Sequence, residues 1–195
     1  MGEPIHKAGG APGVEALATA AKAAGRRGPP PVHLWNPPFC GDLDIRIARD
    51  GTWHYLGTPI GRPALARLFA SILKREGDSY FLVTPVEKVG IRVDDAPFVA
   101  VDFTATGAGP DQRLTFATNV GDETLAGPDN PIRVTRDPAT GEPAPYVHVR
   151  RGLEALIDRK SFYRLVDLGV ERDGAFGVWS GGAFFPFIPA ADLAA

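Results

Sequence analysis

The hydrophobic and polar positions along the chain predict two helices in its first half. In residues 63–73 the apolar side chains recur at steps of three and four, and Pro63 suits the first turn of a helix. These apolar positions are Leu65, Leu68, Phe69, Ile72 and Leu73. A shorter helical pattern covers residues 13–25 and ends where glycines and prolines follow in residues 25–32. We therefore expect a short N-terminal helix and a second helix near residue 63.

Alternating positions around Asp50 and Gly51 predict a β-hairpin with these two residues as its turn. Ile47 would then face His54. One face of the hairpin would carry Ile45, Ile47, His54 and Leu56, and the other would carry Arg46, Ala48, Trp53 and Tyr55. Both faces hold side chains suited to packing, so we expect both to be partly covered.

Further strands are predicted by short apolar or alternating runs between turn residues. They cover residues 79–85, 88–93, 98–106 and 113–119. Within residues 88–93, alternation places Val89, Ile91 and Val93 on one face. Lys88, Gly90 and Arg92 lie on the other, which we expect to be a solvated or ion-paired face.

The second half of the chain repeats the order of the first. Residues 132–137, "IRVTRD", match residues 45–50, "IRIARD", and a strand follows at 146–150. A helical pattern covers residues 152–169, with a break where Ser161 caps a second helix, and strands follow around an Asp173-Gly174 turn. The sequence thus predicts an α+β fold with a tandem β-β-α-β-β repeat, in which two small domains or halves each pack an antiparallel sheet with a helix.

Four segments are expected from this reading. They are a helical arm and Pro-rich linker at residues 1–30, a first α+β domain at 31–96, a second and more β-rich domain at 97–190, and a tail at 191–195.

Composition narrows the class of protein. The chain has 195 residues, 44% of them hydrophobic, and a formal net charge of -2. This charge disfavours nucleic acid as a partner. A single cysteine, Cys40, excludes an internal disulfide and a multi-thiolate zinc site. No apolar stretch has the length of a signal peptide core or a membrane span, so we expect a cytoplasmic protein without a membrane partner.

Several strings resemble one bacterial protein family in combination. They are "DGTW", "TPI", "LVTPVEK" and "DAPF", and the similarity extends over residues 34–189. The chain resembles the DUF1285 family, a family of unknown function. The resemblance implies a two-part α+β fold with repeated motifs and no established reaction or catalytic residues. A role in signalling or in a response to growth conditions has been suggested for the family.

Arg62 is the most suggestive candidate for ligand binding, because a guanidinium and the backbone donors of a helix N-terminus together favour an anion. Aromatic side chains could line the same pocket, and charged residues near strand ends could form its rim. The candidate set is Arg62, Glu87, Lys88, Asp95, Trp53, Tyr55 and His54. Alternatively, the aromatic residues form the core and Arg62 pairs with Glu87 or Asp95.

Other motifs in the sequence give weaker evidence of a functional site. Asp42 and Asp44 have a spacing that binds divalent cations in some transferases, but hard-cation sites usually need more oxygen ligands. Cys40 suits a buried position, and His148 suits a place within a strand. No phosphate-binding loop, dinucleotide motif or EF-hand loop is present, so no cofactor is expected.

Three functions remain open from the sequence. The first is a non-enzymatic module for ligand binding or signalling, with a small anionic molecule in a cleft between two related halves. The second is a hydrolase or transferase of unrecognised type that uses Glu87, Asp94 or Asp95 with His54. The third is an adaptor that binds a protein partner through its Ala-rich N-terminal arm.

Overall fold

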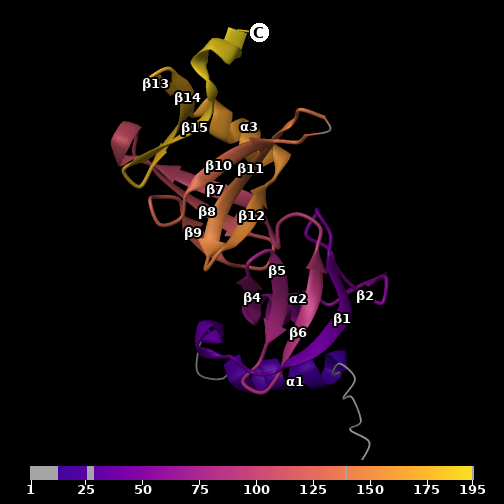
Figure 1. Ribbon diagram of the computed structural model, residues 1–195. Helices are drawn as coiled ribbons and strands as arrows, with labels where there is room; N and C mark the ends of the chain where they lie inside the picture. Colours follow the sequence, from indigo (N-terminus) through magenta and orange to yellow (C-terminus); the bar gives the residue numbers. More distant parts are fainter. Residues whose placement is uncertain (1–12, 26–28, 139, 195) are drawn as a thin grey trace, which may run out of the picture. The chain divides into compact units, whose positions relative to one another are not determined.

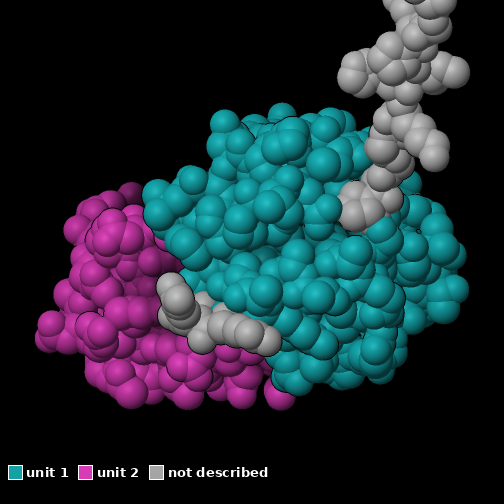
Figure 2. All heavy atoms as spheres, turned by 90° about the horizontal axis from the view of Figure 1, so that it is seen from below, with its two compact units in different colours: residues 1–48, 52–93 teal, residues 49–51, 94–195 magenta. Residues whose placement is uncertain are grey.

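The computed structural model describes residues 13–25, 29–138 and 140–194 and divides the chain into two compact units. Unit 1 comprises residues 1–48 and 52–93, and unit 2 comprises residues 49–51 and 94–195 (Figure 2). No helix in the described part of the chain is long and apolar enough to cross a membrane.

Unit 1 is built on a six-stranded sheet with the order β3-β2-β1-β6-β5-β4 (Figure 1). The strands are β1 (Phe39–Ile47), β2 (Trp53–Tyr55), β3 (Thr58–Pro59), β4 (Leu73–Glu76), β5 (Ser79–Val83) and β6 (Lys88–Val93). Two three-stranded meanders meet where the first strand, β1, pairs in parallel with the last, β6. All other neighbours in this sheet are antiparallel.

Helices α1 (Val14–Ala24) and α2 (Pro63–Ser71) supply the core of unit 1, with a 3-10 turn at Val32–Leu34. Pro63 starts α2 as predicted, but the helix ends at Ser71 and Leu73 already belongs to β4. On α1, Leu17 and Ala21 are fully buried, and α1 packs against α2. The apolar face of the N-terminal helix is therefore covered inside its own unit.

The β1–β2 hairpin has a three-residue turn instead of the predicted two-residue turn. Ile47 pairs with Trp53, and the backbone N–H of Ala48 donates to the carbonyl of Thr52 at 2.9 Å, which leaves residues 49–51 in the turn. Gly51 has a φ of 83°, a left-handed conformation that glycine adopts without strain at the end of such a turn. The register shifts by one residue, so Trp53 lies on the buried face with Ile47 and contacts Phe69 of α2, with ring centroids 6.2 Å apart.

Unit 2 contains a second six-stranded sheet, with the order β10-β11-β12-β7-β8-β9 (Figure 1). Its strands are β7 (Phe98–Thr106), β8 (Arg113–Thr118), β9 (Glu123–Leu125), β10 (Ile132–Arg136), β11 (Pro143–Arg150) and β12 (Leu153–Ile157). Helix α3 (Arg159–Asp167) follows, and then a three-stranded sheet of β13 (Val170–Arg172), β14 (Ala175–Ser180) and β15 (Ala183–Pro189). Short 3-10 turns lie at Gly109–Asp111 and Ala190–Ala194.

The α+β fold in two related parts is confirmed, but the predicted alignment of the two parts is wrong. The first and last strands of each six-stranded sheet, β1 with β6 and β7 with β12, are parallel central neighbours. Hence β1 corresponds to β7, while β10, which contains Ile132, corresponds to β4. The "IRIARD" and "IRVTRD" segments occupy different places in the common plan. The sheets are also mixed, because the central pair of each is parallel while all other neighbours are antiparallel.

Residues 153–157 form strand β12, and the prediction of a helix there is wrong. Leu153, Ala155 and Ile157 are buried while the two residues between them are partly exposed, which is the two-residue period of a strand. The helix starts only at Arg159. Its N-cap is Asp158, whose Oδ1 accepts a hydrogen bond of 2.7 Å from the backbone N–H of Ser161. The Asp173-Gly174 turn between β13 and β14 is confirmed by the pairing of Arg172 with Ala175.

Candidate functional site

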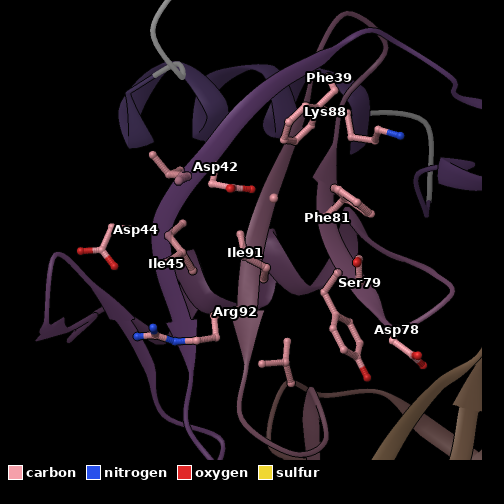
Figure 3. A pocket seen from close by; sticks show the side chains of 14 residues that line it. Phe39, Asp42, Asp44, Ile45, Asp78, Ser79, Phe81, Lys88, Ile91 and Arg92 are labelled. Atoms are coloured by element: carbon pink, nitrogen blue, oxygen red, sulfur yellow. The ribbon is translucent and has the colours of Figure 1, made fainter.

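A groove of about 870 Å³ lies on the sheet of unit 1, over strands β1, β5 and β6 (Figure 3). The pairing of β1 with β6 beneath the groove is irregular. Asp42 pairs with Gly90 and Arg46 pairs with Arg92, so three residues of β1 lie opposite one residue of β6. The extra residues bend β1 away from its neighbour. Gly41, with a φ of 99°, lies just before this segment.

Strand pairing arranges the side chains of the groove face in rows across the sheet. One row contains Phe39 and Lys88, and the next contains Asp42, Gly90 and Phe81. The third row contains His54, Arg46 and Arg92. Register partners in a sheet point to the same face, so the rows run from an aromatic end through an acidic middle to a basic end.

The middle row depends on Gly90. A Cβ atom at this position would lie 2.1 Å from Oδ1 of Asp42, so the carboxylate rests directly over the glycine backbone. Figure 3 shows the Asp42 side chain pointing across toward β6, whereas Asp44 points away from it. The two carboxylates therefore do not converge. The described residues contain no cluster of three or more His, Cys, Asp or Glu side chains suited to a metal ion.

Three of the charged side chains that line the groove, Asp42, Asp44 and Arg92, have no ionic partner among the described residues. Asp42 and Arg92 make no ion pair with any residue that the structure describes, although both are solvent-exposed and lie on neighbouring strands. Lys88 is different, because its Nζ lies 2.9 Å from Oε2 of Glu76 and 4.8 Å from the centre of the Phe81 ring. Phe81 in turn contacts Phe39 edge to face, with ring centroids 6.1 Å apart.

Glu76 bridges two lysines beside the groove. Its other oxygen, Oε1, lies 2.9 Å from Nζ of Lys74. The hydrogen bonds from Lys88 and Lys74 lower the pKa of Glu76 below its ordinary value. Lys88 is therefore held in place as part of the wall. Asp44 points away from β6, so Asp42 and Arg92 are the charges available to a ligand between the strands.

The predicted site residues are not brought together in one place. Arg62 and Tyr55 line a separate concavity of about 470 Å³ near the start of α2. Arg62 precedes the first residue of α2 but pairs with neither Glu87 nor Asp95. Its guanidinium lies 3.5 Å from Glu15, and both side chains are strongly exposed. Such a pair is weak, and it stabilises the unit little.

The other candidates in unit 1 have mixed roles. Trp53 is a core residue, as the alternative interpretation held. His54 is part of the basic row, and its Nδ1 atom is buried without a hydrogen-bond partner among the described residues. Glu87 lies in the turn between β5 and β6, where its backbone N–H donates to Oγ1 of Thr84. Partial burial raises the pKa of Glu87 above its ordinary value.

Asp95 belongs to unit 2 and is held by two neighbours there. Its Oδ1 accepts a hydrogen bond of 2.7 Å from the hydroxyl of Tyr146, and Nε of Arg49 lies 3.2 Å from its Oδ2. Burial and the bond to Asp95 raise the pKa of Tyr146 to about 12. Arg133 lies over the Tyr146 ring, 4.2 Å from its centre. This arrangement explains Asp95 as part of a structural network.

Sequence reasoning missed most of the groove. Asp42 was considered as a metal ligand or as an ion-pair partner of Arg46 and Arg62, and Arg92 as part of a solvated or ion-paired face. Phe39 and Phe81 were not singled out. The signal that points to them is the glycine at position 90 inside a strand, which marks a close approach of another group.

The geometry defines a class of protein, an α+β protein of two units with similar six-stranded sheets and an open groove on the first. Two family models match the chain: the DUF1285 N-terminal domain at residues 30–96 and the DUF1285 C-terminal domain at residues 97–187, both of unknown function. The chain belongs to the DUF1285 family.

Two solved structures are similar to the chain. A crystal structure of a DUF1285 family protein from Silicibacter pomeroyi DSS-3 is 68% identical, covers 92% of this chain and 98% of its own, and superposes with a TM-score of 0.87. A second, from Shewanella baltica OS155, is 35% identical, covers 64% of this chain and 91% of its own, and has a TM-score of 0.50. No functionally curated protein matches.

Proposed function

We propose that this protein is a non-enzymatic binding module that holds a small organic molecule in the groove of unit 1, as a sensor or signalling component. The observation that carries the proposal is the pair of unpartnered opposite charges, Asp42 and Arg92, beside an aromatic wall in a hollow of about 870 Å³. Ligand sites of small molecules have this size and combine apolar walls with a few polar groups that fix orientation.

Asp42 and Arg92 support binding because they do not pair with each other. Opposite charges on neighbouring strands of one face attract each other, and charges that remain unpaired there can instead bind the complementary charges of a ligand. Gly90 supports the same view, since the absence of a side chain lets the Asp42 carboxylate reach across to β6, in the same row as Phe81.

The groove supports binding better than it supports a hydrolase. The carboxylates expected to act in catalysis were Glu87, Asp94 and Asp95, and Asp95 is committed to Tyr146 and Arg49. The proposed site also lies within unit 1, rather than in the cleft between halves that the sequence suggested. An adaptor function through the N-terminal helix has less support, because the buried face of α1 packs against α2.

A thermal-shift screen tests the proposal. The library holds amino acids, dipeptides, nucleotides, sugar phosphates and dicarboxylates. A ligand at about a hundred times its Kd should stabilise the protein by about 2.7 kcal/mol, which is a rise in Tm of roughly 5–10 °C for a chain of this size. The same compounds are then tested on Gly90→Ala, in which the new Cβ displaces the Asp42 carboxylate.

Gly25→Ala is the matched control, because a Cβ at Gly25 meets no atom within 4 Å. The expected result is a hit that stabilises the wild type and Gly25→Ala but not Gly90→Ala. A hit that stabilises Gly90→Ala equally would place the ligand elsewhere and refute the groove. A library without any hit would refute small-molecule binding.

A further inference from the structure

We infer that the ligand of the groove is a zwitterion of dipeptide length, with its ammonium group on Asp42 and its carboxylate group on Arg92. The inference rests on the proposed function, and it adds the chemical class and the orientation of the ligand. It follows from the charge of the two ends, their spacing along β6 and the character of the wall.

Arg92, at the basic end of the groove, favours an anionic group of the ligand. Arg92 lines the groove, is exposed and forms no ion pair with any described residue. A carboxylate matches the fork of donors that its guanidinium presents.

Asp42, in the middle of the groove, favours a cationic group of the ligand. The Asp42 carboxylate projects toward β6 over the bare backbone of Gly90, and no described residue forms an ion pair with it (Figure 3). The Phe81 ring lies in the same row, on the other side of Gly90. An ammonium group there donates a charge-assisted hydrogen bond to the Asp42 carboxylate.

The spacing selects a dipeptide over a free amino acid. Asp42 is level with Gly90, and Arg92 lies two residues further along β6, which corresponds to about 6.6 Å of strand. The ends of an extended dipeptide are about 7 Å apart, whereas the charges of an amino acid are about half as far apart. Beyond Asp42, the edge-to-face pair of Phe39 and Phe81 forms an apolar wall for the N-terminal side chain.

Calorimetry with one dipeptide and its blocked forms tests the inference. The probes are phenylalanyl-alanine, its N-acetyl form, its C-terminal amide and free phenylalanine. Blocking either end should weaken binding to the wild type about tenfold or more, because each block removes a charge-assisted hydrogen bond. Free phenylalanine should bind more weakly than the dipeptide, since it cannot span the two charges.

Variants assign each end of the ligand. In Asp42→Asn, N-acetylation should no longer weaken binding, and in Arg92→Gln, amidation should no longer do so. Asp78→Asn is the matched control, because Asp78 also lines the groove but its carboxylate pairs with Arg75 at 3.5 Å. In this control, both blocks should still weaken binding as in the wild type.

The two proposals fail in different ways. Equal binding of free and blocked dipeptides, or an N-acetyl effect that persists in Asp42→Asn, would overturn the zwitterion. If dipeptides do not bind while another class of compound binds in a Gly90-dependent manner, the groove remains a ligand site and the zwitterion is refuted. If no compound binds, both proposals are refuted.

Discussion

Two fully buried serines in unit 2 differ in their hydrogen bonds and should respond differently to substitution by alanine. Ser180, at the end of β14, donates through Oγ to the carbonyl of Ala126 at 2.7 Å and accepts from the backbone N–H of Leu114 at 2.9 Å. Ser161, in the first turn of α3, has a buried Oγ without a hydrogen-bond partner among the described residues. Both serines are fully buried, with 0% exposure.

The expected costs follow from these bonds. Ser180→Ala leaves one buried N–H and one buried C=O unpaired, and each unpaired group costs about 1–3 kcal/mol, so the variant should lose roughly 2–6 kcal/mol of unfolding free energy. Ser161→Ala removes a hydroxyl that gains nothing from its surroundings, and it keeps the backbone N–H that Asp158 caps. Its stability should therefore be unchanged or higher by up to about 1 kcal/mol.

Urea denaturation followed by far-UV circular dichroism measures both variants against the wild type. Amide hydrogen exchange gives a second readout, since the Leu114 N–H should exchange faster in Ser180→Ala and at the wild-type rate in Ser161→Ala. The reasoning is refuted if Ser180→Ala costs less than about 1 kcal/mol, or if the two variants lose equal stability.

Three further predictions concern titration and capping. The folded-state pKa of Tyr146 is raised to about 12, above the unfolded value of about 10. The contribution of Tyr146 to stability is therefore full below about pH 10 and is lost as the pH rises to about 12. Tyr146→Phe should reduce this alkaline loss of stability by about 1–3 kcal/mol, measured by urea titrations across that pH window. The pKa of Glu87 is raised above its unfolded value near 4.5, so the contribution of Glu87 to stability is greatest below that value and falls as pH rises through the folded value. Glu87→Gln should therefore match the stability of the wild type at low pH and exceed it by roughly 0.5 kcal/mol at pH 7. An equal gain in stability at both pH values would contradict this cause. Asp158→Ala should cost about 1 kcal/mol through loss of the α3 cap, and Asp158→Asn should recover most of it in the same assay.

The sequence predicted many of the strands and turns of the fold, because these depend on neighbours in the chain. Alternation located β5 to β8 and the Asp173-Gly174 turn, and a helical period with Pro63 located α2. Pairing was harder. A parallel contact between β1 and β6 joins residues separated by most of a unit, and no local pattern encodes it.

Two errors arose from patterns that fit more than one structure. "DG" suits a two-residue turn, yet it also fits a three-residue turn that ends in a left-handed glycine, and the second option buries Trp53. "LEALI" fits one turn of a helix as well as a strand, and tertiary pairing of β12 with β11 and β7 decided for the strand. Short apolar runs carry this ambiguity whenever no cap marks a helix start.

The candidate site was harder to predict than the fold, because its residues come from strands that meet only by pairing. Asp42 and Phe81 are far apart in the chain, and both are neighbours of Gly90 only across the sheet. Arg62, by contrast, attracted attention through its local position before a helix. Its partner, Glu15, lies on α1 and could not be inferred from local sequence.

The groove is a consequence of one irregular strand and not of the sheet plan, as a comparison of the two units shows. In unit 2, the corresponding parallel pair of β12 and β7 advances residue for residue, with Ala155, Leu156 and Ile157 opposite Phe98, Val99 and Ala100. This pairing is regular, and five of these six side chains are buried. In unit 1, the parallel pair of β1 and β6 contains extra residues of β1 between Asp42 and Arg46. This irregular pairing accompanies the placement of the Asp42 carboxylate over Gly90. The common plan therefore builds both cores, while the insertion in β1 gives only the first sheet a place for a ligand.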